Sequence, residues 1–123
     1  MLGVAYTEVR AGFARCHVVV DRGRHNPSGI AHGAVAYTLL DSAMGAAFYM
    51  ALERPLGCAT MEPKVNYLRP IVAGRMEATA ELIERTTRFG ILTGRVVDEQ
   101  HQLIALAQGT FAIMQPKSVA SAE

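Results

Sequence analysis

Asp41 is the residue of this sequence that is best placed to act as a chemical base. Apolar residues flank it on both sides, and carboxylates are rarely buried without a partner. A carboxylate in a poorly hydrated position can deprotonate a water molecule or attack an electrophilic carbon, and such groups are enriched where catalysis happens. The alternative is an ionised side chain that is tied to Thr38, Ser42 or an arginine for structure alone.

Gly33 can contribute through its backbone. It stands where a stretch rich in turn-forming residues becomes a long apolar segment. We therefore expect its N–H among the unpaired donors of a helical first turn, at the positive end of the helix dipole. Such a donor can hold an oxyanion. The alternative is a glycine that only permits a tight turn into the helix.

Gly33 and Asp41 are too far apart to act on one carbonyl from a single chain. They are eight residues apart, which at about 1.5 Å per residue separates them by about 12 Å along a helix. A general base must come within about 3 Å of its proton, directly or through one water. If both residues serve one reaction, they come from two chains, so the spacing predicts a homodimer with shared active sites.

Three further residues carry weaker signals. Asn26 can donate an amide hydrogen bond to a carbonyl or a water, although Asn-Pro is also an ordinary turn dipeptide. Thr60 can orient a water beside Asp41, or it is simply a β-branched strand residue. His32 is a base or a ligand, or it caps and positions the start of the helix. A metal site on His25 and His32 lacks a further ligand at suitable spacing, so we expect no metal.

The elements that must position these residues follow from the hydrophobic periodicity. One long apolar helix, with its polar members Tyr37, Thr38, Asp41 and Ser42 within an arc of about 140°, needs a sheet that curls around it. We therefore expect an α+β fold in which a curved antiparallel sheet of five to six strands wraps one central helix. The open edges of such a sheet also favour a partner chain. The expected elements are strands at Val4–Glu8 and Phe13–Val20, a loop at Asp21–Ile30, a helix at Gly33–Leu52, and strands at Cys58–Leu68, Arg75–Glu84, Arg88–Asp98 and Leu103–Met114.

Length and composition limit the function classes. The 123 residues fit one domain, which we expect over residues 1–114, followed by a disordered tail at 115–123. The net charge of +1 comes from scattered charges, which predicts no nucleic-acid partner and no membrane surface. Without a signal peptide pattern we expect a cytoplasmic protein, with Cys16 and Cys58 as buried reduced thiols. There is no Gly-x-Ser-x-Gly elbow, P-loop or GxGxxG motif.

The segment NPSGIAHGAVAYTLLDSAMG, residues 26–45, resembles the signature of the hotdog-fold acyl-CoA thioesterases of the PaaI type. The strands TMEPKVNYLRP (60–70) and LIALAQGTF (103–111) resemble that family as well, so the likeness covers roughly residues 4–114. The family usually has His-Gly-Gly where this chain has His32-Gly33-Ala34. The resemblance implies a hotdog fold and hydrolysis of an acyl-CoA, with coenzyme A as part of the substrate and no further cofactor.

The resemblance also implies roles for individual residues. Asp41 would be the base or nucleophile, the Gly33 N–H would polarise the carbonyl, and Asn26 would align the carbonyl or the water. Thr60 falls where family members often place a small hydroxyl near the acid, and pairs of dimers would form a homotetramer. Segments that line the coenzyme A channel in the family correspond here to Tyr67, Leu68, Arg69 and Pro70, and to Arg85, Thr86, Thr87, Arg88 and Phe89.

Several alternatives remain open at this level. A hotdog module could bind acyl-CoA without catalysis, and a hotdog hydratase or dehydratase could use a His–acid pair. Arg69, Arg85 and Arg88 either meet the phosphates of coenzyme A or are solvated charges at strand ends. The large helical side chains either line an acyl pocket suited to aryl or medium-chain groups or belong to the core; these are Tyr37, Met44, Phe48 and Tyr49.

Overall fold

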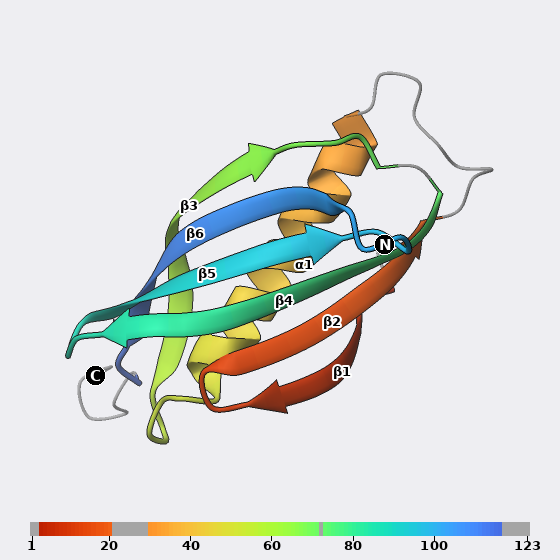
Figure 1. The fold of residues 1–123 in the computed structure, drawn as a ribbon. Coiled ribbons are helices and arrows are strands. Elements are labelled where there is room, and N and C mark those ends of the chain that lie inside the picture. The colour runs from red at the N-terminus through yellow and green to blue at the C-terminus, as the bar shows by residue number, and fades with distance from the viewer. Residues whose placement is uncertain (1–2, 21–29, 72, 117–123) are drawn as a thin grey trace.

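The fold is a single curved antiparallel sheet around one helix, as predicted from the periodicity. The computed structural model describes residues 3–20, 30–71 and 73–116. The sheet order is β1-β2-β4-β5-β6-β3, so β1 and β3 are the edge strands of the described sheet. Figure 1 shows the sheet bending around α1. The elements are β1 (Ala5–Arg10), β2 (Phe13–Val20), α1 (Ile30–Tyr49), β3 (Gly57–Tyr67), β4 (Gly74–Arg85), β5 (Phe89–Val97) and β6 (Leu103–Met114).

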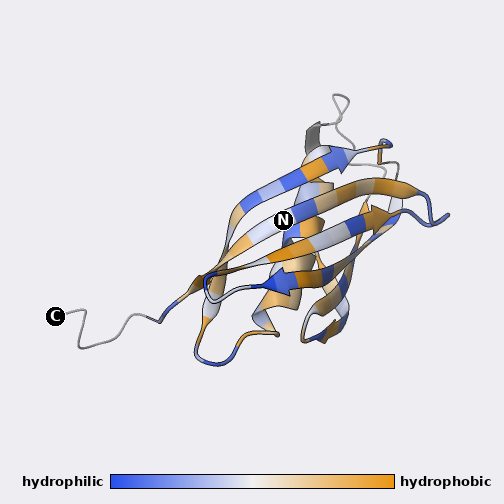
Figure 2. Cartoon of the chain, turned by 60° about the vertical axis from the view of Figure 1, so that its left-hand side comes forward, coloured by the Kyte–Doolittle hydropathy of each residue, from blue (hydrophilic) through white to orange (hydrophobic). Residues whose placement is uncertain are grey.

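The strands present one face to the helix and the other to the outside. In β4, Met76, Ala78 and Ala80 are buried, whereas Glu81 and Ile83 are exposed. This alternation is the period-2 pattern of a sheet with one covered face. Figure 2 shows the same change between hydrophobic and hydrophilic residues along the strands.

The helix packs closely against the inner face of the sheet because several inward positions on β5 and β6 have no side chain. A Cβ added at Gly90 would come within 2.4 Å of the Phe48 ring, and one at Gly109 within 3.1 Å of Met44. Phe48 also meets Phe111 edge-on, with ring centroids 6.3 Å apart. These small residues let the largest helical side chains reach the sheet without voids.

Two predicted segments fall wholly or mostly outside the described residues. The loop predicted at Asp21–Ile30 lies outside them except for Ile30, which begins α1. The tail predicted at 115–123 is described only at Gln115 and Pro116, which have no regular structure. The predicted first hairpin is present, and its turn uses Gly12 at φ 82°, a conformation that favours glycine.

The bounds of the helix differ from the prediction at both ends. It begins at Ile30 instead of Gly33 and ends at Tyr49 instead of Leu52. Beyond Tyr49 the hydrogen bonds join residues three apart instead of four. The N–H of Ala51 donates to the Phe48 carbonyl, and the N–H of Leu52 donates to the Tyr49 carbonyl. Such bonds between residues three apart satisfy the last carbonyls of a helix and end it.

The sheet covers only part of the circumference of α1 in the protomer. Leu39, Leu40, Ala43 and Met44 are fully buried against the sheet. The opposite stripe of α1 is half-buried or exposed, and we call it the open stripe: Ala34, Tyr37, Thr38, Asp41, Ser42, Gly45, Ala46 and Tyr49. The reason is that the sheet stops at β1 on one side of the helix and at β3 on the other.

Candidate active site

Asp41 lies in a cavity of about 430 Å³ on the open stripe of α1. Its Oδ1 atom accepts a hydrogen bond of 2.7 Å from the Thr60 hydroxyl on β3. The side chain is therefore held by a neutral donor, and a carboxylate has further lone pairs for another donor such as a water. The cavity is lined by Tyr6, Asp41, Ser42, Gly45, Ala46, Tyr49, Cys58, Ala59, Thr60 and Phe111.

A β-bulge at Met61 brings Thr60 to the helix side of β3. Thr60 pairs with the buried Phe111, and the register then shifts, so that Met61 has no partner before Glu62 meets Thr110. Because side chains alternate along a strand, Thr60 and Tyr67, seven positions apart, would face opposite sides of a regular strand. The extra residue puts both on the helix side, each beside a predicted functional position of α1.

Gly33 lies in a second cavity, of about 380 Å³, at the N-terminal part of α1. The Tyr67 hydroxyl donates to the Gly33 carbonyl at 3.3 Å. Gly33 is the fourth residue of α1 rather than the first, so the intrahelical acceptor for its N–H is the carbonyl of residue 29, which lies outside the described residues. Its part as an oxyanion donor stays a prediction. The lining residues are Gly33, Ala36, Tyr67, Leu68, Arg69, Pro70, Ile71 and Ile104.

The two cavities are separate and carry different charges. They share no lining residue, and their key residues stand about 12 Å apart along the helix axis. Among the lining residues of the Asp41 cavity none is basic, whereas Arg69 belongs to the wall of the Gly33 cavity. Within one protomer, therefore, the Asp41 carboxylate and Gly33 do not meet, as the spacing predicted.

Two predicted site residues are outside the part of the chain that can be described at side-chain level. Asn26 lies in residues 21–29, and the side chain of His32 is likewise outside the described set. Their roles stay predictions.

Among the described residues, no three His, Cys, Asp or Glu side chains come together as a metal site requires. In the same set, no helix is both long enough and apolar enough to cross a bilayer.

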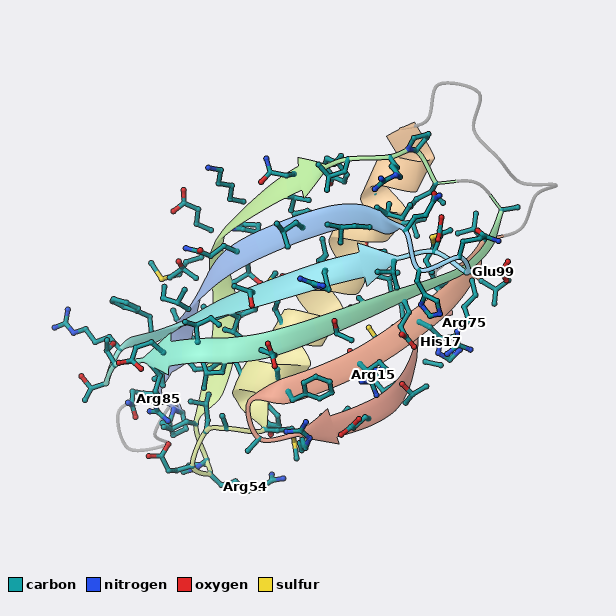
Figure 3. The ribbon with its side chains drawn as sticks, viewed as in Figure 1. Arg15, His17, Arg54, Arg75, Arg85 and Glu99 are labelled. Carbon is teal, nitrogen blue, oxygen red and sulfur yellow. The ribbon has the colours of Figure 1, made fainter. Side chains whose placement is uncertain are left out.

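The two segments predicted to line a coenzyme A channel lie at opposite ends of the protomer. Tyr67–Pro70 lines the Gly33 cavity, and the Arg69 guanidinium donates to the Leu103 carbonyl at 2.6 Å. Arg85, in contrast, pairs with Glu53 beyond the C-terminal end of α1 at 2.9 Å. Figure 3 shows Arg85 at the far end of the sheet from Arg75 and Glu99. One protomer thus brings only the first segment to Gly33.

Of the large helical side chains, only Tyr49 lines the Asp41 cavity. Met44 and Phe48 are fully buried and belong to the core, while Tyr37 is exposed and lines neither of the two cavities. One face of the helix meets the sheet and the other is open, so Met44 and Phe48 belong to the core, whereas contact of Tyr49 with an acyl group stays a prediction.

Tyr6 is the cavity residue that sequence reasoning missed. It comes from β1, and its hydroxyl donates to the Ser42 carbonyl at 3.4 Å. Burial is the main cause that raises the pKa of Tyr6, with smaller contributions from Cys16 and Asp41. The register of the β1–β2 hairpin decides which residues of β1 face the helix. A bulge at Thr7 shifts this register, so that Tyr6 pairs with Cys16. A regular hairpin would have turned Thr7 to the helix instead.

The two cysteines are free, as predicted, and only Cys16 is fully buried. Burial raises the pKa of the Cys16 thiol to about 11. Cys58 is half-buried in the Asp41 cavity. Burial, and to a smaller extent the charge of Asp41, raises the pKa of its thiol as well. Both groups are therefore protonated at neutral pH and act as small apolar side chains.

Comparison with known proteins adds to this geometry. The sequence model of the family described as "Thioesterase superfamily" matches residues 28–105. A protein of Halobacterium salinarum, whose name assigns it esterase activity only provisionally, is 30% identical over 93% of this chain and 82% of its own length. The 1,4-dihydroxy-2-naphthoyl-CoA hydrolase of Listeria monocytogenes is 25% identical over 94% of each chain. The solved structure of the E. coli PaaI protein matches with a TM-score of 0.84 at 24% identity, covering 94% of this chain and 83% of that one.

Proposed function

Because the chain belongs to the thioesterase superfamily and has the hotdog fold of PaaI-type members, we propose that it hydrolyses acyl-CoA thioesters to a free acid and coenzyme A. The acyl group is aryl or of short to medium length. A relative named as a CoA hydrolase supports this substrate class. The observation that carries the proposal is the Asp41 carboxylate, held by Thr60 in an open cavity without a basic neighbour among its lining residues.

Each active site lies between two subunits of a homodimer. The open stripe of α1 and the edge strand β3 support this assembly, because they leave Tyr37, Met61 and Tyr67 exposed on adjoining elements. An edge strand with apolar side chains is a ready surface for pairing with a second copy. Two antiparallel helices, packed along the part of their open stripes between Gly33 and Asp41, bring Asp41 of one subunit beside the partner's Gly33. Two such dimers form the homotetramer that the family resemblance implies.

The same arrangement accounts for the second coenzyme A segment. When Gly33 lies level with the partner's Asp41, the partner's helix continues about 12 Å past Gly33 before it ends. The partner's Arg85–Phe89 segment then approaches the end of the protomer that carries Tyr67–Pro70. Guanidinium groups from both subunits are thus available for the phosphates of coenzyme A.

The chemistry requires few groups. Asp41 accepts a proton from a water as that water attacks the acyl carbon, while the partner's Gly33 N–H binds the carbonyl oxygen. Collapse of the tetrahedral intermediate breaks the C–S bond and releases the thiolate, whose conjugate acid has a pKa of about 8.5, so a strong general acid is unnecessary. In the alternative route Asp41 attacks the acyl carbon itself, the C–S bond breaks to release the thiolate, and water then hydrolyses the mixed anhydride to the free acid and the Asp41 carboxylate.

Thiol release from a panel of acyl-CoAs tests the activity, because neither a binding module nor a hydratase liberates coenzyme A. Subunit mixing tests the shared site. Asp41→Asn and Gly33→Pro are each expected to be inactive, and a random mixture of the two to regain about a quarter of the wild-type rate, because half the dimers then have one intact site in two. Mixtures that stay as inactive as their parents contradict shared sites.

Gly33→Ala is the matched control for Gly33→Pro. It keeps the backbone N–H, and a Cβ added at Gly33 meets no described heavy atom within 4 Å. Proline removes the N–H, but at the fourth helical position it also removes a donor of the helix itself. We therefore expect Gly33→Ala to retain most of the activity and Gly33→Pro to lose it, and circular dichroism shows whether the proline variant keeps its helix.

A further inference from the structure

The acyl part of the substrate belongs at the Asp41 cavity, because Asp41 acts on the acyl carbon, an inference that rests on the proposed function. The floor of this cavity is the open stripe of α1, from Asp41 to Tyr49, a distance of about 12 Å along the helix. Gly45 and Ala46 on α1 and Cys58 on β3 line the cavity with small, mainly apolar groups. Since no basic residue is among those that line it, the phosphates of coenzyme A are better placed in the cavity that contains Arg69.

Tyr6 is the one residue of β1 among those that line this cavity. The other lining residues come from α1, β3 and β6, so Tyr6 closes the side opposite to β3. Its hydroxyl reaches across to the Ser42 carbonyl, one turn of helix before Gly45 and Ala46. The Tyr6 side chain thus links β1 to α1, although 49% of the residue is exposed in the protomer.

The position of Tyr6 depends on a local irregularity of β1. The bulge at Thr7 places Tyr6 opposite Cys16, whose thiol lies 3.7 Å from the Leu39 carbonyl of α1. Bulges beside active sites commonly redirect a side chain. Here the bulge turns an aromatic ring toward the helix, whereas a regular strand would present the smaller Thr7.

We propose that Tyr6 is the specificity-determining residue of the acyl cavity and limits the size of the acyl group. Its ring stands on the β1 side of the cavity, with its hydroxyl at Ser42, and takes up space that a bulkier acyl group beside Asp41 would need. The limit comes from the ring and not from the hydroxyl, because the hydroxyl is already engaged by the Ser42 carbonyl. Discrimination in an apolar pocket by a few carbon atoms amounts to about 10- to 200-fold.

The test compares kcat/KM across acyl-CoAs of increasing chain length, together with benzoyl and naphthoyl thioesters, for the wild type, Tyr6→Ala and Tyr6→Phe. For Tyr6→Ala we expect the ratio of kcat/KM for the largest to the smallest productive substrate to rise by about 10-fold or more. Tyr6→Phe keeps the ring, so its profile should follow that of the wild type. Tyr67→Ala, in the Gly33 cavity, should change the rates for all acyl groups by a similar factor.

An unchanged ranking of substrates in Tyr6→Ala overturns this proposal, as does a ranking that changes equally in Tyr67→Ala. If Tyr6→Ala fails to fold by circular dichroism, Tyr6→Leu supplies the same comparison with more of the strand packing retained. A wild-type protein that releases no coenzyme A from any substrate contradicts the proposed function itself. The two failures are therefore distinguishable.

Discussion

The two cavities of this protomer lie on the same helix but differ in the groups that line them. The Gly33 cavity combines a helix N-terminal segment, the Tyr67 hydroxyl and the Arg69 guanidinium. The Asp41 cavity combines a carboxylate, the Thr60 hydroxyl and small apolar walls. One is suited to electron-rich oxygen and phosphate groups, and the other to a proton and a hydrocarbon group.

This difference teaches that, under the proposed mechanism, neither cavity of one protomer holds every group that the reaction needs. A carbonyl needs an oxyanion donor and a base within hydrogen-bond reach, and about 12 Å of helix separates the two here. The division of groups between cavities is what a shared site in a homodimer requires. The predictions below test each cavity in turn.

The largest effect is expected at Asp41. Asp41→Asn keeps the size of the side chain but removes the base, so kcat should fall by about 10²- to 10⁴-fold while the protein stays folded. Thiol release under saturating substrate measures it. Glu81→Gln, which removes an exposed carboxylate from β4, is the control and should have no effect. Retention of activity in Asp41→Asn would assign Asp41 a purely structural role.

A smaller effect is expected at Thr60. Thr60→Val preserves the β-branched shape but loses the hydrogen bond to Asp41, so the carboxylate is less well oriented. A loss of about 1.4 kcal/mol of transition-state stabilisation corresponds to about a tenfold decrease in kcat. Thr60→Ser keeps the donor and should recover most of the rate. Equal rates for the valine and serine variants would show that the hydroxyl has no part in positioning Asp41.

The Gly33 cavity should respond in KM rather than in kcat. Arg69→Ala removes an exposed guanidinium, and exposed ion pairs contribute about 0.2–1 kcal/mol, so KM should rise by about 1.4- to fivefold for every acyl-CoA. Steady-state kinetics at low ionic strength make the effect largest. Arg95→Ala, an exposed arginine of β5, is the matched control. A change that depends on the acyl group would argue against the division of the substrate between the cavities.

The smallest effect concerns the Cys58 thiol, whose pKa is raised mainly by burial and partly by the charge of Asp41. At pH 8 its thiolate fraction is therefore lower than that of an unperturbed cysteine, and alkylation should accelerate as pH rises. Asp41→Asn removes the negative charge and so lowers the pKa, which should increase the iodoacetamide rate at pH 8 by less than tenfold. Mass spectrometry separates Cys58 from Cys16, whose burial should protect it. An unchanged Cys58 rate would place Asp41 too far away to affect the thiol.

Local patterns predicted much of the fold. The alternation of Met76, Ala78 and Ala80 predicted which face of β4 is buried, and the apolar run after Gly33 predicted the helix. The ends of α1 were displaced by three residues, because helix termini depend on which backbone groups find partners and not on periodicity. The sequence also placed Asp41 on a polar stripe, which is the stripe that the sheet leaves open.

The composition of the two cavities was harder to predict, because it depends on bulges in both edge strands. The extra residue at Met61 lets Thr60 and Tyr67 share one face of β3, and the extra residue at Thr7 turns Tyr6 toward Ser42. A bulge has no strong signature in a single sequence, and a shift of one residue reverses every side chain beyond it. Tyr6 was missed for this reason.

The amino-acid sequence alone determined the order of the elements and the eight-residue spacing of Gly33 and Asp41, because both depend on local periodicity and on the fixed rise of a helix. Only the tertiary structure decided that the open stripe faces a gap between β1 and β3, and that Tyr6, Thr60 and Phe111 converge there. The physical reason is that strand pairing and bulge positions are set by contacts between residues far apart in the chain.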